Sequence, residues 1–305
     1  MMRLFALLLT IGSLTSSVNA QSATVVVPSW PAYCHKGYVK NIGGVDVWVG
    51  SVNININGAA YNSYCIQYNA YLYDGYTYTA PISAAPDLPK WRSISYILTW
   101  YHSSSISNDM GFAIQAAIWN YVPGTDPTGE CYKSGSLAQQ IFNTASGKNV
   151  VRPGDSLTLT PNNTAVPVGS SQIITARIVD ASGSPKSGVK ILFSTTFGFL
   201  DKTEGITDVN GEVKISITSS VAGIAEITAS TKGMWAHILD MQRNGHHYQH
   251  IIGVGYPELV TKSTFVFVQF FVIPEVSLGT VTVILTSLVT AAVKSKIERH
   301  KQKGL

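Results

Sequence analysis

Hydrophobic positions change their spacing along the first half of the chain. Residues 23–27 and 45–54 alternate or run in β-branched residues, and Asn57-Gly58 is a tight-turn sequence between 52–56 and 60–68, which predicts a hairpin. Apolar residues then recur at helical spacing in 91–101, 112–121 and 137–145. We therefore expect residues 21–152 to form an α+β domain, a β-sandwich or barrel with a helical insertion.

The second half of the chain has the pattern of strands alone. Short β-rich segments are separated by turn sequences containing Gly, Pro or Asn; they lie at 156–160, 173–179, 189–194, 213–218 and 225–229. Such spacing predicts an immunoglobulin-like β-sandwich over residues 155–232. We expect residues 233–272 to extend it with a polar β-hairpin around Asn244-Gly245 and a strand at 264–272. The fold class is thus multidomain and mainly β.

The two ends of the chain have targeting patterns. Residues 1–20 combine Arg3, an apolar run and a small-residue cleavage site, which predicts a secretory signal peptide. Residues 276–293 are uncharged and apolar over a length that crosses a bilayer. We expect a transmembrane helix at 275–294 and, because the following residues are basic, a cytoplasmic tail at 295–305. The chain would then be exported to the cell surface and anchored by its C-terminus.

Composition and charge support an extracellular protein. Charged residues make up only 12% of the chain, about half the usual ~25%. The formal net charge is +4, but the last dozen residues, 294–305, carry five Lys or Arg residues and a single Glu. The rest of the chain is nearly neutral, so no basic face for nucleic acid is expected.

The cysteine count leaves one thiol unpaired in an oxidising compartment. The chain has three cysteines, Cys34, Cys65 and Cys131, and an odd number requires a free or intermolecular thiol. One alternative joins Cys65 to Cys34 or to Cys131 in a disulfide. The other pairs Cys34 with Cys131 and leaves Cys65 free for chemistry.

Two short motifs point to that chemistry. Tyr64-Cys65-Ile66 resembles the aromatic-Cys-apolar motif of thioester domains, and 115–119, Gln-Ala-Ala-Ile-Trp, resembles their Gln-x-Ala-apolar-Trp motif. Ile114 precedes the glutamine, where many members have Thr. The resemblance covers about 130 residues and implies an internal Cys65–Gln115 thioester in a domain at the tip of a bacterial surface adhesin. Such a bond is spent once, so we expect no turnover enzyme and no cofactor.

The chemistry places requirements on the surroundings of the bond. The thiol needs activation and the amide needs a polarising donor, either a backbone N–H or a Tyr hydroxyl. Apolar neighbours would keep water from the thioester. The expected pocket residues are Tyr64, Ile66, Ile114, Ile118 and Trp119. The expected partner is a surface protein or polymer that offers an amine or hydroxyl. We interpret His102, in a polar stretch, as a solvated surface residue.

Further resemblances concern the rest of the chain. Residues 176–193 and 207–213 resemble bacterial immunoglobulin-like domains of the invasin type, which implies a stalk. Residues 273–279, followed by the apolar run and basic end, resemble archaeal surface-protein tails with a Pro-Glu-Phe-type signal, although Val276 replaces the aromatic residue. A plain membrane anchor explains the same residues.

Other functions have less support. The histidines of 237–250 (His237, His246, His247 and His250) gather around Asn244-Gly245, and two of them could bind a metal across a hairpin. Their spacing matches no familiar zinc pattern, so we interpret them as part of a polar β-hairpin and assign no metal site. A secreted hydrolase lacks a Gly-x-Ser-x-Gly motif and a placed carboxylate pair. The main alternative is a structural or non-covalent binding protein of the cell envelope, with Cys65 in a disulfide and Gln115 an ordinary side chain.

Overall fold

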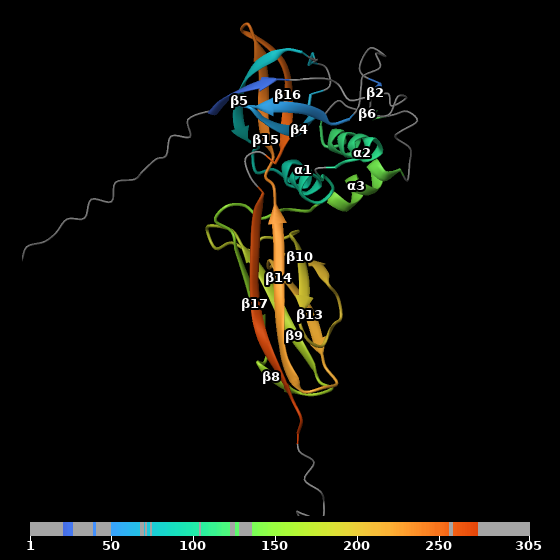
Figure 1. Ribbon diagram of the computed structural model, residues 1–305, viewed down its shortest axis with the longest axis vertical. Coiled ribbons are helices and arrows are strands. Elements are labelled where there is room, and N and C mark those ends of the chain that lie inside the picture. The colour runs from blue at the N-terminus through green and yellow to red at the C-terminus, as the bar shows by residue number, and fades with distance from the viewer. Residues whose placement is uncertain are drawn as a thin grey trace, which may run out of the picture.

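The computed structural model describes residues 21–26, 39–40, 50–67, 70, 72–73, 75–103, 105–122, 126–127, 136–255 and 259–273. A barrel with three helices lies at one end and a β-sandwich at the other (Figure 1). The predicted signal peptide, transmembrane segment and basic tail lie outside these residues, as do Cys34 and Cys131. Among the helices that are described, none is long and apolar enough to cross a membrane.

Six strands close the barrel in the order β1-β3-β4-β16-β15-β5. They are β1 (Gln21–Val26), β3 (Val52–Ile56), β4 (Ala59–Cys65), β5 (Thr77–Ala84), β15 (His237–Arg243) and β16 (His246–Val254). The predicted hairpin at Asn57-Gly58 is confirmed as β3–β4, with positive φ angles of 51° and 93° at the two turn residues. A two-stranded sheet, β2 (Val39–Lys40) with β6 (Asp126–Pro127), lies apart from the barrel order.

Three helices follow β5, as the periodicity predicts: α1 (Pro89–Trp100), α2 (Asn108–Trp119) and α3 (Leu137–Ala145). Pro89 begins α1, where its missing N–H costs no helical hydrogen bond. Ser107 and Ser136 cap α2 and α3 by accepting from the backbone N–H of Met110 and Gln139. The buried faces of α1 and α2 share one hydrophobic core with the barrel.

The second domain is a sandwich of two sheets. Their orders are β12-β10-β14-β17-β8 and β11-β13-β9-β7, and a second hydrophobic core lies between them. The strands are β7 (Ser156–Pro161), β8 (Ala165–Pro167), β9 (Ser171–Val179), β10 (Lys190–Thr195), β11 (Phe199–Leu200), β12 (Glu204–Ile206), β13 (Glu212–Thr218), β14 (Gly223–Gly233) and β17 (Val260–Phe271). All five segments that the sequence predicts as strands here are strands.

The hairpin β15–β16 belongs to the barrel, although the sequence pattern predicts it as part of an extension of the second domain. β14 and β17 pair along the full length of β14, from Gly223↔Phe270 to Gly233↔Val260, so the hairpin is an insertion between two neighbouring sandwich strands (Figure 1). It fills the gap between β4 and β5 and thereby closes the barrel. The domain that contains Cys65 is therefore discontinuous in sequence.

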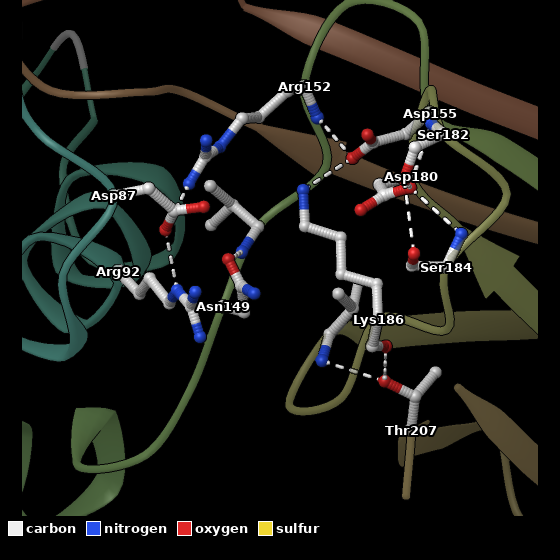
Figure 2. Close-up of polar contacts among 12 residues, drawn as sticks. Asp87, Arg92, Asn149, Arg152, Asp155, Asp180, Ser182, Ser184, Lys186 and Thr207 are labelled. Atoms are coloured by element: carbon white, nitrogen blue, oxygen red, sulfur yellow. Dashed lines mark hydrogen bonds and ion pairs between the residues drawn. The ribbon is translucent and has the colours of Figure 1, made fainter. Parts of the chain in front are cut away.

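Polar contacts tie the two domains together where the chain passes between them. Asp87, just before α1, contacts Arg92 at 2.6 Å and Arg152 of the connecting segment at 2.8 Å (Figure 2). On the sandwich side, Asp155 accepts from the Arg152 backbone N–H and from the buried Lys186 Nζ. The segment between β14 and β15 is held against helix α1, because Met234 N–H donates to Thr99 Oγ1 at 2.8 Å. These contacts hold the two segments that connect the domains.

Candidate functional site

Cys65 and Gln115 meet inside the barrel domain. Gln115 Oε1 accepts a hydrogen bond from the Cys65 backbone N–H, and Gln115 Nε2 donates to the Cys65 carbonyl oxygen, both at 2.8 Å. Gln115 is 1% exposed and Cys65 is 8% exposed. The two predicted residues are thus in direct contact, although they lie fifty positions apart in the sequence.

A side chain can bind to the Cys65 backbone because the pairing of β3 with β4 stops before this residue. Ile66 N–H donates to His250 O on β16, so the N–H and C=O of Cys65 point to the opposite side, toward β3. The β3–β4 register ends at Val52↔Ser63, so no β3 residue is paired with Cys65. The Gln115 carboxamide, which has one donor and one acceptor group, takes the place of the missing strand partner.

Helix α2 brings the carboxamide to this position. Small buried residues surround Gln115 on the helix, namely Gly111, Ala113, Ala116 and Ala117, and small side chains let a helix approach a sheet closely. Asn120 continues from the helix with its backbone N–H bonded to Ala116 O. The geometry therefore combines a rigid helix with a fixed strand end, which holds the amide carbon beside the cysteine.

The Cys65 thiol has a polar partner of its own. Its Sγ lies 3.3 Å from Gln249 Oε1, to which it donates, and Gln249 Nε2 in turn donates to Gln67 O at 2.6 Å. Burial raises the pKa of the thiol to about 12, although the hydrogen bond to Gln249 opposes the rise. At neutral pH the sulfur therefore keeps its proton. Cys65 is a free thiol in the structure.

The expected pocket residues all contribute to the same core. Tyr64, Ile114, Ile118 and Trp119 are at most 2% exposed, and the partly buried Ile66 packs against them. The donor to the amide oxygen is the cysteine's own N–H. A Tyr hydroxyl is the other kind of donor expected, but the hydroxyl of Tyr64 lies 3.0 Å from His102 Nδ1. A pocket of about 360 Å³ opens beside the strand end and is lined by Ile66, Trp91 and His250 among others.

The interpretation of His102 as a solvated surface residue is wrong. His102 is half-buried, makes an edge-on ring contact with Tyr64 and lies 3.4 Å from Asn62 Nδ2. Burial lowers the pKa of its imidazole, which favours the neutral ring. Because Tyr64 and Cys65 are adjacent on a strand, their side chains point to opposite faces, and His102 is on the Tyr64 side.

Sequence reasoning missed Gln249 and Gln67. Both are amides in stretches where no motif marks them, and Gln249 reaches Cys65 only because β16 pairs with β4 across more than 180 residues. No local pattern marks Gln249, because it lies between Tyr248 and His250 in the polar first half of the strand 246–254. Three ligand-type residues of the same hairpin also converge: Asp240, His247 and His250 place one ligand atom each within 4.8 Å of the others.

The comparisons with known proteins concern both domains. The bacterial Ig-like domain (group 1) family matches residues 155–237, and no curated protein matches the chain. Among solved structures, the thioester domain of the Enterococcus faecium TIE86 protein is 11% identical, with 81% of this chain and 93% of that one covered and a TM-score of 0.36. The thioester domain of the Staphylococcus aureus TIE protein is 15% identical, with coverage of 83% and 99% and a TM-score of 0.34.

The chain is also similar to parts of two intimin structures. The D0-D1 domain of intimin is 19% identical over 38% of this chain, with a TM-score of 0.25. The chain spans 48% of that structure and 33% of a second intimin structure.

Proposed function

We propose that the protein is a cell-surface adhesin that binds its partner covalently through a thioester between Cys65 and Gln115. The observation that carries the proposal is the pair of 2.8 Å hydrogen bonds between the Gln115 carboxamide and the Cys65 backbone. These bonds hold the carboxamide against the backbone of the residue whose thiol would attack it, in a site from which water is largely excluded. The match of residues 155–237 to a bacterial Ig-like family supports a stalk that presents the barrel.

In the first step Cys65 Sγ attacks Gln115 Cδ, and the Cδ–Nε2 bond breaks. The Cys65 N–H is already directed at Oε1, where negative charge develops, so it acts as the oxyanion donor. The thiol proton passes to the departing nitrogen, which leaves as ammonia. Because burial keeps the thiol protonated, this proton transfer accompanies the attack; the thiol does not ionise first.

In the second step a partner's lysine amine, or a hydroxyl, attacks the same carbon. The C–S bond breaks, the nucleophile's proton goes to the sulfur, and an amide or ester now joins Gln115 to the partner. The Cys65 N–H again faces the carbonyl oxygen. An amide is a weaker acyl donor than a thioester, and the tethered amine cannot diffuse away as ammonia does, so reversal is disfavoured. The bond is therefore formed and spent once, without turnover.

Export and a C-terminal anchor complete the proposal. The signal-peptide pattern of residues 1–20 and the apolar run of 276–293 with its basic flank support them. The anchor would hold the sandwich near the membrane and direct the barrel outward.

Intact mass of the purified protein tests the bond. We expect the protein to be lighter than its sequence by one ammonia, and to gain one methylamine while a single thiol appears. A Cys34→Ala/Cys131→Ala variant is the matched control, because Cys65 is then the only cysteine that can supply the thiol. A Cys65→Ala variant should have its full sequence mass. Full mass in the unmodified protein, or a deficit that persists in Cys65→Ala, contradicts the proposal.

A further inference from the structure

We propose that Asp240, His247 and His250 form a binding site for a divalent transition-metal ion, with zinc best suited to its donors. Asp240 lies on β15, and both histidines lie on β16. Their ligand atoms are within 4.8 Å of one another. From the sequence alone no metal site is assigned here, since the histidine spacing matches no familiar zinc pattern.

A β-bulge brings the two histidines to one face. In a regular strand, residues three positions apart point to opposite faces. Here the register passes from Met241↔Gln249 to Gln242↔His247, so Tyr248 is an extra residue with no partner position on β15. His247 and His250 consequently share a face with Asp240, which is paired with His250. Gln249, between them, points the other way and reaches Cys65.

The three side chains already have the arrangement of a ligand set. Asp240 Oδ1 lies 2.5 Å from His247 Nδ1 and 3.5 Å from His250 Nε2. Donor atoms around tetrahedral zinc lie roughly 3.4 Å apart, given bonds of about 2.0–2.2 Å. Insertion of the ion thus requires the Asp240–His247 contact to open by roughly 1 Å, a movement that side-chain rotation can supply.

The atoms that would not bind the ion are held by other side chains. Gln242 Nε2 donates to Asp240 Oδ2 at 2.5 Å, and His247 Nε2 lies 2.9 Å from Gln67 Oε1. Gln67 Oε1 also accepts from the His250 backbone N–H at 3.1 Å, which fixes it as the oxygen of the amide. His247 Nε2 must therefore carry a proton to donate to it, which leaves Nδ1 as the ligand atom. Partners of this kind orient metal ligands in known sites.

The donor set and exposure indicate the kind of ion. Two imidazole nitrogens and one carboxylate oxygen suit zinc and its neighbours in the transition series, whereas calcium and magnesium prefer oxygen alone. The side chains of Asp240, His247 and His250 are 28%, 37% and 42% exposed. An ion can therefore enter from solvent and keep a water molecule, or a group from a partner, as its fourth ligand.

Calorimetric titration with zinc chloride tests the site in the full chain, prepared without a polyhistidine tag and freed of metal with a chelator. We expect one zinc ion per chain. Asp240→Ala and His250→Ala should weaken the affinity at least about 100-fold, and Gln67→Ala, which removes an orienting partner, by about 10- to 100-fold. His246→Ala is the matched control, because it removes an exposed histidine of the same hairpin that lies outside the cluster.

Two further measurements test the coordination geometry of the bound ion and the folding of each variant. Cobalt bound to the unmodified protein should give the intense visible absorption of four-coordinate geometry, and the bands should be lost in His250→Ala but kept in His246→Ala. Urea unfolding in the presence of chelator checks that each variant is folded. Absence of zinc binding by the unmodified protein, or unchanged affinity in folded Asp240→Ala and His250→Ala, overturns the proposal. Cys65→Ala should bind zinc normally, so the site stands independently of the thioester.

Discussion

At the scale of single residues, burial governs the reactivity of Cys65. An exposed thiol has a pKa near 8.5, whereas burial raises that of Cys65 to about 12. Because the neutral form is favoured in the folded state, folding loses stability as the pH rises above about 8.5, where the unfolded chain's thiol ionises. The raised pKa also sets the rate at which Cys65 is alkylated, because only the thiolate form reacts.

We predict that alkylation of Cys65 in a Gln115→Ala/Cys34→Ala/Cys131→Ala variant keeps rising about tenfold per pH unit through pH 10. The substitution at 115 removes the thioester, and the other two remove competing thiols. Iodoacetamide labelling followed by intact mass measures the rate. The same variant unfolded in urea is the control, and its rate should level off near pH 9. A plateau at that pH in the folded protein would show that the thiol is not desolvated.

Gln249 positions the sulfur. Its Oε1 accepts from Cys65 Sγ while its Nε2 is held by Gln67 O. We predict that Gln249→Met slows ammonia loss during refolding roughly fivefold, since the sulfur loses the side chain that orients it and is less often in the attacking geometry. The time course of intact mass measures this rate. Gln172→Met, a buried amide in the sandwich, should leave the rate unchanged, and equal rates in both variants would exclude the role of Gln249.

At the scale of elements, helix α2 carries the reactive amide, and its start depends on Ser107. Ser107 Oγ accepts from Met110 N–H at 3.2 Å. We predict that Ser107→Ala lowers the free energy of unfolding by about 1 kcal/mol, measured by urea denaturation. The nearby exposed Ser105 offers the control, because Ser105→Ala should change stability by less than about 0.5 kcal/mol. Equal effects of the two substitutions would show that capping is not the cause.

The elements of this protein could be predicted from sequence where the signal is local. The turn at Asn57-Gly58, the helix periodicity after Pro89 and the evenly spaced sandwich strands all have near-neighbour causes, and the structure contains each element. The contact of Cys65 with Gln115 was a hypothesis from two motifs. Its geometry was not predictable, because the strand end that accepts the amide depends on where the β3–β4 register stops.

The pairing of strands far apart in the chain could not be predicted from the sequence pattern. Strands β15 and β16 have the alternation of an ordinary hairpin, and nothing local states that they pair with β5 and β4 of a distant segment. The bulge at Tyr248 adds a second obstacle, since it reverses which histidines share a face. The contact of Gln249 with Cys65 therefore depends on closure of the barrel, and the Asp240 cluster depends on the bulge in the hairpin.

At the scale of the whole molecule, a buried ion pair lies on the sandwich side of the junction between the domains. Lys186 Nζ lies 2.5 Å from Asp155 Oδ2, and the side chains are 9% and 3% exposed. We predict that Lys186→Met destabilises the protein by about 3–5 kcal/mol, because an unpaired carboxylate is left buried. The exposed pair Lys214–Glu212 is the control, and Lys214→Met should cost at most about 1 kcal/mol. Chemical denaturation compares them, and a small effect at Lys186 would mean that Asp155 regains solvent or is neutralised.

The discontinuity of the barrel domain gives the last prediction. Residues 21–152 alone lack β15 and β16, so β4 and β5 would keep unpaired edges and the barrel would stay open. The chain leaves and re-enters this domain at one place, where the backbone of Val151 lies against Gly233. A short Gly-Ser linker can therefore join residues 21–152 to 234–255. We expect this joined chain to unfold cooperatively and to lose ammonia, whereas residues 21–152 alone should do neither. Cooperative unfolding and an ammonia deficit in the shorter fragment would mean that the reactive site assembles without the hairpin, in which case Gln249 could have no part in it.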